Sequence, residues 1–263
     1  MLKREFKINL KSFIIWFAVL AGMYLMVYLM YPYIINDETI KSMDQMMKVM
    51  PPEMLKAFNM DMASISTAYG WLKTEGFVYV LLILGIYSSI LGGTIVLKEE
   101  SDKTIEYLGT LPVTRSKIMT NKIIVGISYI IAMTLLFFAF NYICLTISGD
   151  FAHKEFILLS LTPLFVSLPL FAINLFISMF LHKTRSTIGI SLGMVFFFYI
   201  LNVLSELSSK VEAVKYFSIY TLADVRNVIT NVRINPMCIY ISLGITLLFI
   251  GFSYMIYDKK ELV

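Results

Sequence analysis

Charged residues are scarce in this sequence, and six long stretches of it contain none. Of the 263 residues only 15% are Asp, Glu, Lys or Arg, against about a quarter in an ordinary soluble domain. The uncharged stretches are residues 12–35, 76–97, 123–149, 156–181, 186–205 and 234–257. Each has about 20 residues or more, which as an α-helix crosses a hydrocarbon core of ~30 Å. We therefore predict an all-α integral membrane protein with six transmembrane helices, forming a single domain over residues 1–263.

The sequence also has few of the residues from which catalytic sites are built. No G-x-x-x-x-G-K-[ST] motif is present, so the chain cannot bind ATP in a P-loop. The short polar segments between the spans cannot fold as a catalytic domain. The two histidines, His153 and His182, are expected on opposite sides of the membrane and so cannot share a zinc ion. We expect no catalytic residue, no metal site and no cofactor in this chain.

An intramembrane hydrolase stays as a remote alternative because of the adjacent pair Glu99 and Glu100. Some membrane metalloproteases use Glu-Glu-x-x-x-Arg together with histidines inside the membrane. Here position 104 is threonine, and the histidines are expected to lie far apart, so the motif is incomplete.

Lysine and arginine are distributed unequally between the two sets of polar segments. Thirteen of the 22 lie in four short segments: Lys3, Arg4, Lys7, Lys11, Lys98, Lys103, Arg115, Lys117, Lys122, Lys183, Arg185, Lys259 and Lys260. The other nine are spread mainly over two long loops, residues 36–75 and 206–233. Because short cytoplasmic loops are enriched in positive charge, both termini are predicted to be cytoplasmic. The net charge of +4 then reflects orientation in the membrane, and no nucleic-acid partner is expected.

This orientation also places the two cysteines. Cys144 and Cys238 are expected near the outer ends of their spans. Packing as small apolar residues is the default for such cysteines, and whether the two form a bridge is left open.

Residues 1–11 are predicted to form a short amphipathic helix that lies in the cytoplasmic membrane interface. Leu2, Phe6 and Leu10 are spaced four apart, and the basic residues fall on other faces. A frayed terminus that is merely positive is the alternative.

The longest polar segment between two adjacent spans is the candidate functional centre. Residues 98–118 read KEESDKTIEYLGTLPVTRSKI and follow a glycine-rich helix end, GGTIVL. Ser101 can cap a short helix, Gly109 can end it, and Pro112 prevents its continuation. Ile105 and Leu108 form a small apolar edge beside acidic residues. The pattern favours a short rigid helix that docks in the groove of a partner, with a solvated connector as the alternative.

This segment resembles the corresponding part of the ABC-2 family, the membrane subunits of type-2 ABC exporters. Those permeases carry a small residue, Glu, Gly/Lys-Thr-hydrophobic-Glu and Leu-x-x-x-Pro-hydrophobic-Ser/Thr-Arg here, and Lys103 stands where many members have Gly. The resemblance implies a short cytoplasmic coupling helix between spans 2 and 3 that docks on an ATPase subunit. The residues expected to take part are Glu99, Glu100, Asp102, Lys103, Thr104, Ile105, Glu106, Leu108, Pro112 and Arg115.

The resemblance also implies partners and a task. Two permease chains, as a homodimer or with a related chain, would pair with two cytoplasmic ABC ATPase subunits that hold ATP and Mg. The permease would form the translocation path of an exporter in a bacterial plasma membrane. Spans without charge but rich in aromatic residues and methionine favour a hydrophobic or amphipathic substrate, such as a peptide toxin, bacteriocin or antibiotic. A non-transporting sensor or immunity protein of the same fold is the alternative.

Small residues in two spans are placed for close helix packing. Five fall on one face of the second span: Gly85, Ser88, Ser89, Gly92 and Gly93. Packing within the subunit and sliding during gating are both open for that face. In the fifth span Gly189 and Gly193 form a GxxxG pair, which predicts contact with a second copy.

Overall fold

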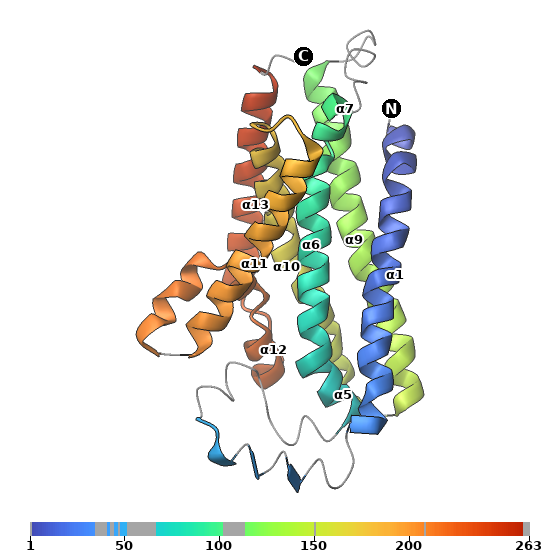
Figure 1. Ribbon diagram of the computed structural model, residues 1–263, viewed down its shortest axis with the longest axis vertical. Helices are drawn as coiled ribbons and strands as arrows, with labels where there is room; N and C mark the ends of the chain where they lie inside the picture. The colour runs from blue at the N-terminus through green and yellow to red at the C-terminus, as the bar shows by residue number, and fades with distance from the viewer. Residues whose placement is uncertain are drawn as a thin grey trace.

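Each of the six uncharged stretches corresponds to one long helix in the computed structural model of the chain (Figure 1). The structure describes residues 2–34, 41–42, 45–46, 48–51, 67–101, 114–149, 151–207 and 209–259. Within them, the helices long and apolar enough to cross a membrane are α1 (Leu2–Ile34), α6 (Phe77–Thr94), α9 (Arg115–Ser148), α10 (His153–Ser178), α11 (Thr184–Leu207) and α13 (Pro236–Tyr257). The predicted all-α architecture with six spans is confirmed.

Short helices lie at the two ends of this bundle. They are α5 (Ala68–Trp71), the π-helix η1 (Leu72–Gly76), α7 (Leu97–Ser101), the 3₁₀ helices η2 (Ser209–Phe217) and η3 (Ile219–Ala223), and α12 (Val225–Asn231). Figure 1 shows α7 at the same end as both chain termini, whereas α5 and α12 lie at the opposite end. We call the first end, which also carries the start of α9, the connector end.

Helix α10 forms the centre of the bundle and packs against α6, α9 and α13. Leu170, Phe171 and Leu175 of α10 have no exposed surface. In the most apolar stretch of each helix, 56% of the residues of α6 and α10 are buried, against 17% for α1, α11 and α13. Lipid tails are as apolar as leucine, so outer helices can expose apolar side chains to the bilayer at little cost.

Residues 2–11 are helical as predicted, but they form the first turns of α1, which continues without a break to Ile34, and not a separate short helix. Their position in the membrane interface stays a prediction. Leu2 and Leu10 are exposed, as lipid contact requires, but Glu5 and Asn9 are buried. At 1.5 Å per residue a helix of 33 residues is about 50 Å long, well beyond a ~30 Å hydrocarbon core. Helix α9, with 34 residues, is equally long.

The small residues of α6 lie against other helices of the same chain. A Cβ atom added to Gly92 would lie 2.2 Å from the carbonyl oxygen of Phe171, and one added to Gly85 would lie 2.3 Å from the Tyr220 hydroxyl. One on Gly93 would lie 2.6 Å from Thr187. Ser88 and Ser89 have no exposed surface. This face of α6 therefore packs against other helices of the same chain. Its sliding during gating stays a prediction.

The glycines of α11 have a different setting. A Cβ atom on Gly189 or Gly193 would meet no atom of the described residues within 4 Å, so both positions face away from that part of the chain. Their contact with a second copy stays a prediction.

An ion pair holds the short helices at the opposite end. Lys73 of η1 donates to Glu155 in the first turn of α10 at 3.0 Å, and both side chains are 12% exposed. Of the two cysteines, Cys144 is buried, Cys238 is half-buried, and both are free thiols.

Candidate functional site at the connector end

The segment between the second and third spans, which we call the connector, begins where the second span ends. Helix α6 ends at Thr94, residues 95–96 form a turn, and α7 starts at Leu97. The break follows Gly92, Gly93 and Thr94. Glycine and threonine are poor helix formers, so the helix is weak at this point. The carbonyl oxygen of Ile95 accepts a hydrogen bond of 2.9 Å from the ammonium group of Lys122 on α9. A side chain of another helix therefore stabilises the bend.

Lys122 also joins two carboxylates from two further elements. Its Nζ atom lies 3.0 Å from Oε2 of Glu99 on α7 and 3.4 Å from Oε2 of Glu5 on α1. The lysine side chain is 1% exposed, and those of Glu5 and Glu99 are 3% and 9% exposed. We call Glu5, Lys122 and Glu99 the buried triad. It ties α1, α9 and the connector together at one point.

The pKa of the Glu99 carboxyl is raised by its burial and by the second carboxylate of the triad. Burial raises the pKa of the Glu99 carboxyl most strongly, because desolvation disfavours the anion. Lys122 lowers the pKa, and the neighbouring Glu5 carboxylate raises it. The net direction is upward from the ordinary value of 4.5. The buried environment of Glu99 therefore favours the neutral form of its carboxyl more than water does.

Acidification is expected to tighten the attachment of α7 to the bundle. Because the pKa of Glu99 is raised in the attached state, that state binds the proton more strongly. The added stability is fully present below the ordinary carboxyl pKa and is lost as the pH rises through the raised value. A spin label on exposed Ser101 should therefore lose mobility as the pH is lowered towards the ordinary carboxyl pKa.

Glu99→Gln is the control for this measurement, because it removes the titrating group. The other titratable or charged groups around Glu99 stay in place: Glu5 on α1, Lys122 on α9, Tyr257 on α13, Glu100 on α7 and His182 after α10. An equal pH response in Glu99→Gln would assign the effect to one of those groups instead.

The far end of the connector is attached to the last helix. Arg115, the first residue of α9, donates from Nη1 to the carbonyl oxygen of Asp258 at 3.2 Å. The hydroxyl groups of Thr120 and Tyr254 are 2.7 Å apart, one turn further along the two helices. A cation at the C-terminus of α13 also interacts favourably with the helix dipole. The two ends of the connector are thus held by different helices.

The family model of the ABC-2 family transporter proteins matches residues 1–262, nearly the whole chain. The chain belongs to this family. Comparison with curated proteins and with solved structures found no match. The resemblance seen in the connector sequence is therefore confirmed. ABC-2 proteins are multi-pass membrane subunits of ABC transporters, are not themselves catalytic, and generally work with a cytoplasmic ATPase.

The structure describes only part of the coupling segment predicted for this ABC-2 protein. Asp102, Lys103, Thr104, Ile105, Glu106, Leu108 and Pro112 lie outside the described residues. Of the remaining three, Glu99 and Glu100 have buried side chains that point to neighbouring elements, with Glu100 3.8 Å from Nδ1 of His182. Arg115 contacts the end of α13. These three residues therefore contact neighbouring elements of the bundle, and their part in coupling stays a prediction.

Sequence reasoning missed Lys122 and Glu5. Lys122 was counted only among the charges of the short segments that predict the orientation of the ABC-2 chain, yet it is almost fully buried. One signal was available, because Glu5 is the only acidic residue in the first 36 and stands among four basic ones. A lone carboxylate in a basic segment indicates an ion pair, but the sequence does not show which lysine or arginine is its partner.

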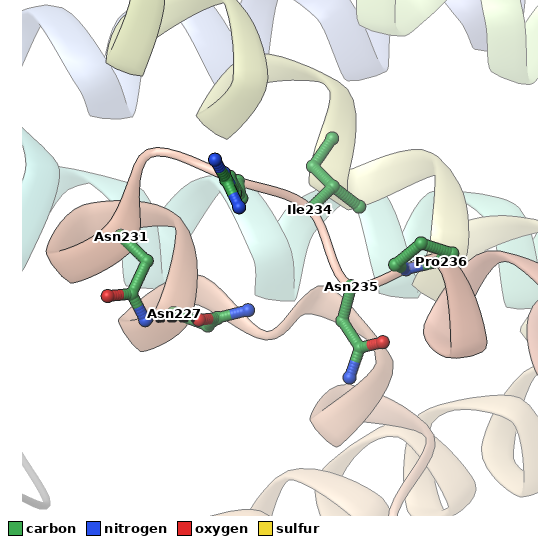
Figure 2. A pocket seen from close by; sticks show the side chains of 6 residues that line it. Asn227, Asn231, Ile234, Asn235 and Pro236 are labelled. Atoms are coloured by element: carbon green, nitrogen blue, oxygen red, sulfur yellow. Dashed lines mark hydrogen bonds between the residues drawn. The ribbon is translucent and has the colours of Figure 1, made fainter.

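One surface hollow lies at the opposite end of the bundle and contains none of the predicted site residues. It has a volume of about 470 Å³. Figure 2 shows Asn227 and Asn231 of α12 on one side, with Ile234, Asn235 and Pro236 on the segment that enters α13. It is an open, polar surface hollow beside α12, at the opposite end of the bundle from α7 (Figure 1). The triad is therefore the stronger candidate site.

Proposed function

We propose that this ABC-2 protein is the permease subunit of an ATP-driven exporter and that residues 98–117 couple it to a separate ATPase. Two copies would form a homodimer with two ATPase subunits, which bind and hydrolyse ATP with Mg. The connector end would face the cytoplasm of a bacterial cell. The unequal distribution of lysine and arginine supports this orientation, since both termini and α7 lie at the end with the short basic segments.

The observation that carries the proposal is the attachment of the connector at both of its ends. Glu99 joins it to α9 and α1, and Arg115 joins it to α13. A segment anchored in this way can pass a displacement at the membrane surface to three spans. The sequence between the anchors, with apolar Ile105 and Leu108 beside acidic residues, suits a groove in a partner.

The substrate we propose is hydrophobic or amphipathic, such as a peptide toxin, a bacteriocin or an antibiotic. The uncharged stretches contain many aromatic residues and methionines, which can contact varied apolar ligands. Stimulation of ATP hydrolysis by substrate in the reconstituted complex would separate an exporter from a non-transporting sensor.

Leu108→Asp is expected to abolish co-purification of the ATPase. The change places a charge where an apolar side chain would enter the partner's groove, and burying an unpaired carboxylate there costs several kcal/mol. A tagged chain should be purified from its native membranes and its partners identified by mass spectrometry. Wild type should retain an ABC ATPase, and Leu108→Asp should lose at least about tenfold of it.

Val49→Asp serves as the matched control, since Val49 is 86% exposed and its segment lies at the opposite end of the bundle (Figure 1). It adds the same charge without touching the connector and should retain the ATPase. If Leu108→Asp retains as much ATPase as Val49→Asp, the segment is an ordinary connector and the proposal fails.

A further inference from the structure

The buried triad contains one more negative charge than positive charge. Lys122 supplies the single ammonium group for the carboxylates of Glu5 and Glu99, and all three side chains are at least nine-tenths buried. Separating a buried ion pair normally leaves one charge without a partner, which is strongly unfavourable. Here the lysine would keep a carboxylate even if one of the two left.

The two carboxylates belong to helices of very different length. Glu5 belongs to α1, whose first turns are fixed to α9: the hydroxyl of Tyr129 donates to the carbonyl oxygen of Phe6 at 2.5 Å. The Tyr129 ring also packs against Phe6 and Phe13, with ring centroids 5.4 and 5.0 Å apart. Glu99 belongs to α7, a helix of only five residues that follows a turn. Of the two carboxylates, Glu99 is therefore the one that can move away from Lys122.

We propose that Glu5 is a standby partner for Lys122, which allows Glu99 and α7 to detach from the bundle without leaving a buried lysine unpaired. In the attached arrangement the triad carries an excess negative charge. In the detached arrangement Lys122 and Glu5 form a balanced pair, and Glu99 regains water. The two arrangements therefore differ little in free energy, which is what a moving element requires. The purpose of this movement rests on the proposed coupling function, but the movement itself does not.

The proposal predicts that two similar substitutions act unequally. Glu5→Gln removes the standby partner, so detachment of Glu99 would leave Lys122 buried without a carboxylate, and the connector should be locked. Glu99→Gln removes both the attraction to Lys122 and the repulsion from Glu5, so its effect should be small. The double variant leaves Lys122 without a carboxylate in either arrangement, and the lock should disappear.

Hydrogen–deuterium exchange of the peptide that covers residues 95–101 measures detachment directly, because amides exchange through transient opening even when it is rare. The chain should be studied alone in lipid nanodiscs, without an ATPase. Relative to wild type, Glu5→Gln should slow this exchange about tenfold or more, and Glu99→Gln should change it less than about threefold. The double variant should return to near the wild-type rate.

Glu5→Asp is the matched control, because it keeps the charge and should exchange like wild type. Exchange that is unchanged or faster in Glu5→Gln would show that Glu5 is an ordinary structural partner, and the proposal would be wrong. Additive effects in the double variant would also overturn it. Since no ATPase is present, these results are separate from the Leu108→Asp test, which addresses coupling alone.

Discussion

Replacing Lys122 by methionine is expected to leave little folded protein. Methionine fills a similar volume but leaves two buried carboxylates without a cation, and removing one partner of a buried ion pair costs about 3–5 kcal/mol. The carbonyl oxygen of Ile95 would also lose its donor, at a cost of about 1–3 kcal/mol. Solubilised Lys122→Met should show a strongly lowered yield and a midpoint of thermal unfolding far below that of wild type.

The same helix provides the control for this prediction. Lys117 lies five residues earlier on α9 and is exposed, so Lys117→Met should unfold close to the wild-type temperature. The triple variant Glu5→Gln, Lys122→Met, Glu99→Gln removes every charge of the triad and should recover much of the lost stability. If Lys122→Met were as stable as Lys117→Met, the ammonium group would not be desolvated as the structure describes.

Gly92→Ala is expected to destabilise the bundle although it adds a single methyl group. The added Cβ atom would lie 2.2 Å from the carbonyl oxygen of Phe171 and 3.0 Å from its Cα. Both contacts are with the backbone of the central helix α10, so no side-chain rotation can relieve them. Overpacking of this kind costs about 1–3 kcal/mol. The thermal midpoint should fall by several degrees, measured by size-exclusion chromatography after heating.

Gly189→Ala makes the same change on α11, where the new methyl group meets nothing within 4 Å. The fold of the single chain should tolerate it. A loss of chain stability as large as that of Gly92→Ala would mean that the glycine face of α11 packs within the chain. A loss restricted to dimer assembly would support its predicted role between copies.

The spans could be predicted from sequence because each is a local property of the chain. An uncharged stretch of about 20 residues has one stable solution in a bilayer, and every predicted span is found as a long helix. The packing face of α6 could also be predicted, because helical spacing alone places Gly85 and Gly92 on one face. The ends were harder: α9 begins at Arg115, whereas its uncharged stretch begins at residue 123. A helix can continue through charged residues once it leaves the hydrocarbon core.

The buried triad could not be predicted in the same way. Its members come from three segments, and Glu5 and Lys122 are 117 positions apart in the sequence. Helical periodicity places Lys122 on a face of α9 but does not show that α1 and α7 meet there. Glu99 was identified from its motif, and only the structure shows that its carboxylate points to α9.

The length of α1 connects the triad to the physical state of the membrane. A helix longer than the hydrocarbon core adapts to bilayer thickness chiefly by tilting, at a cost of fractions of a kcal/mol per Å of mismatch. Only 17% of the residues in the most apolar stretch of α1 are buried, and the helix carries Glu5 at its fourth position. A thinner or thicker bilayer therefore acts on the same carboxylate that shares Lys122 with the connector. We therefore expect lipid composition to affect this end of the molecule through the ion pair of Glu5 and Lys122.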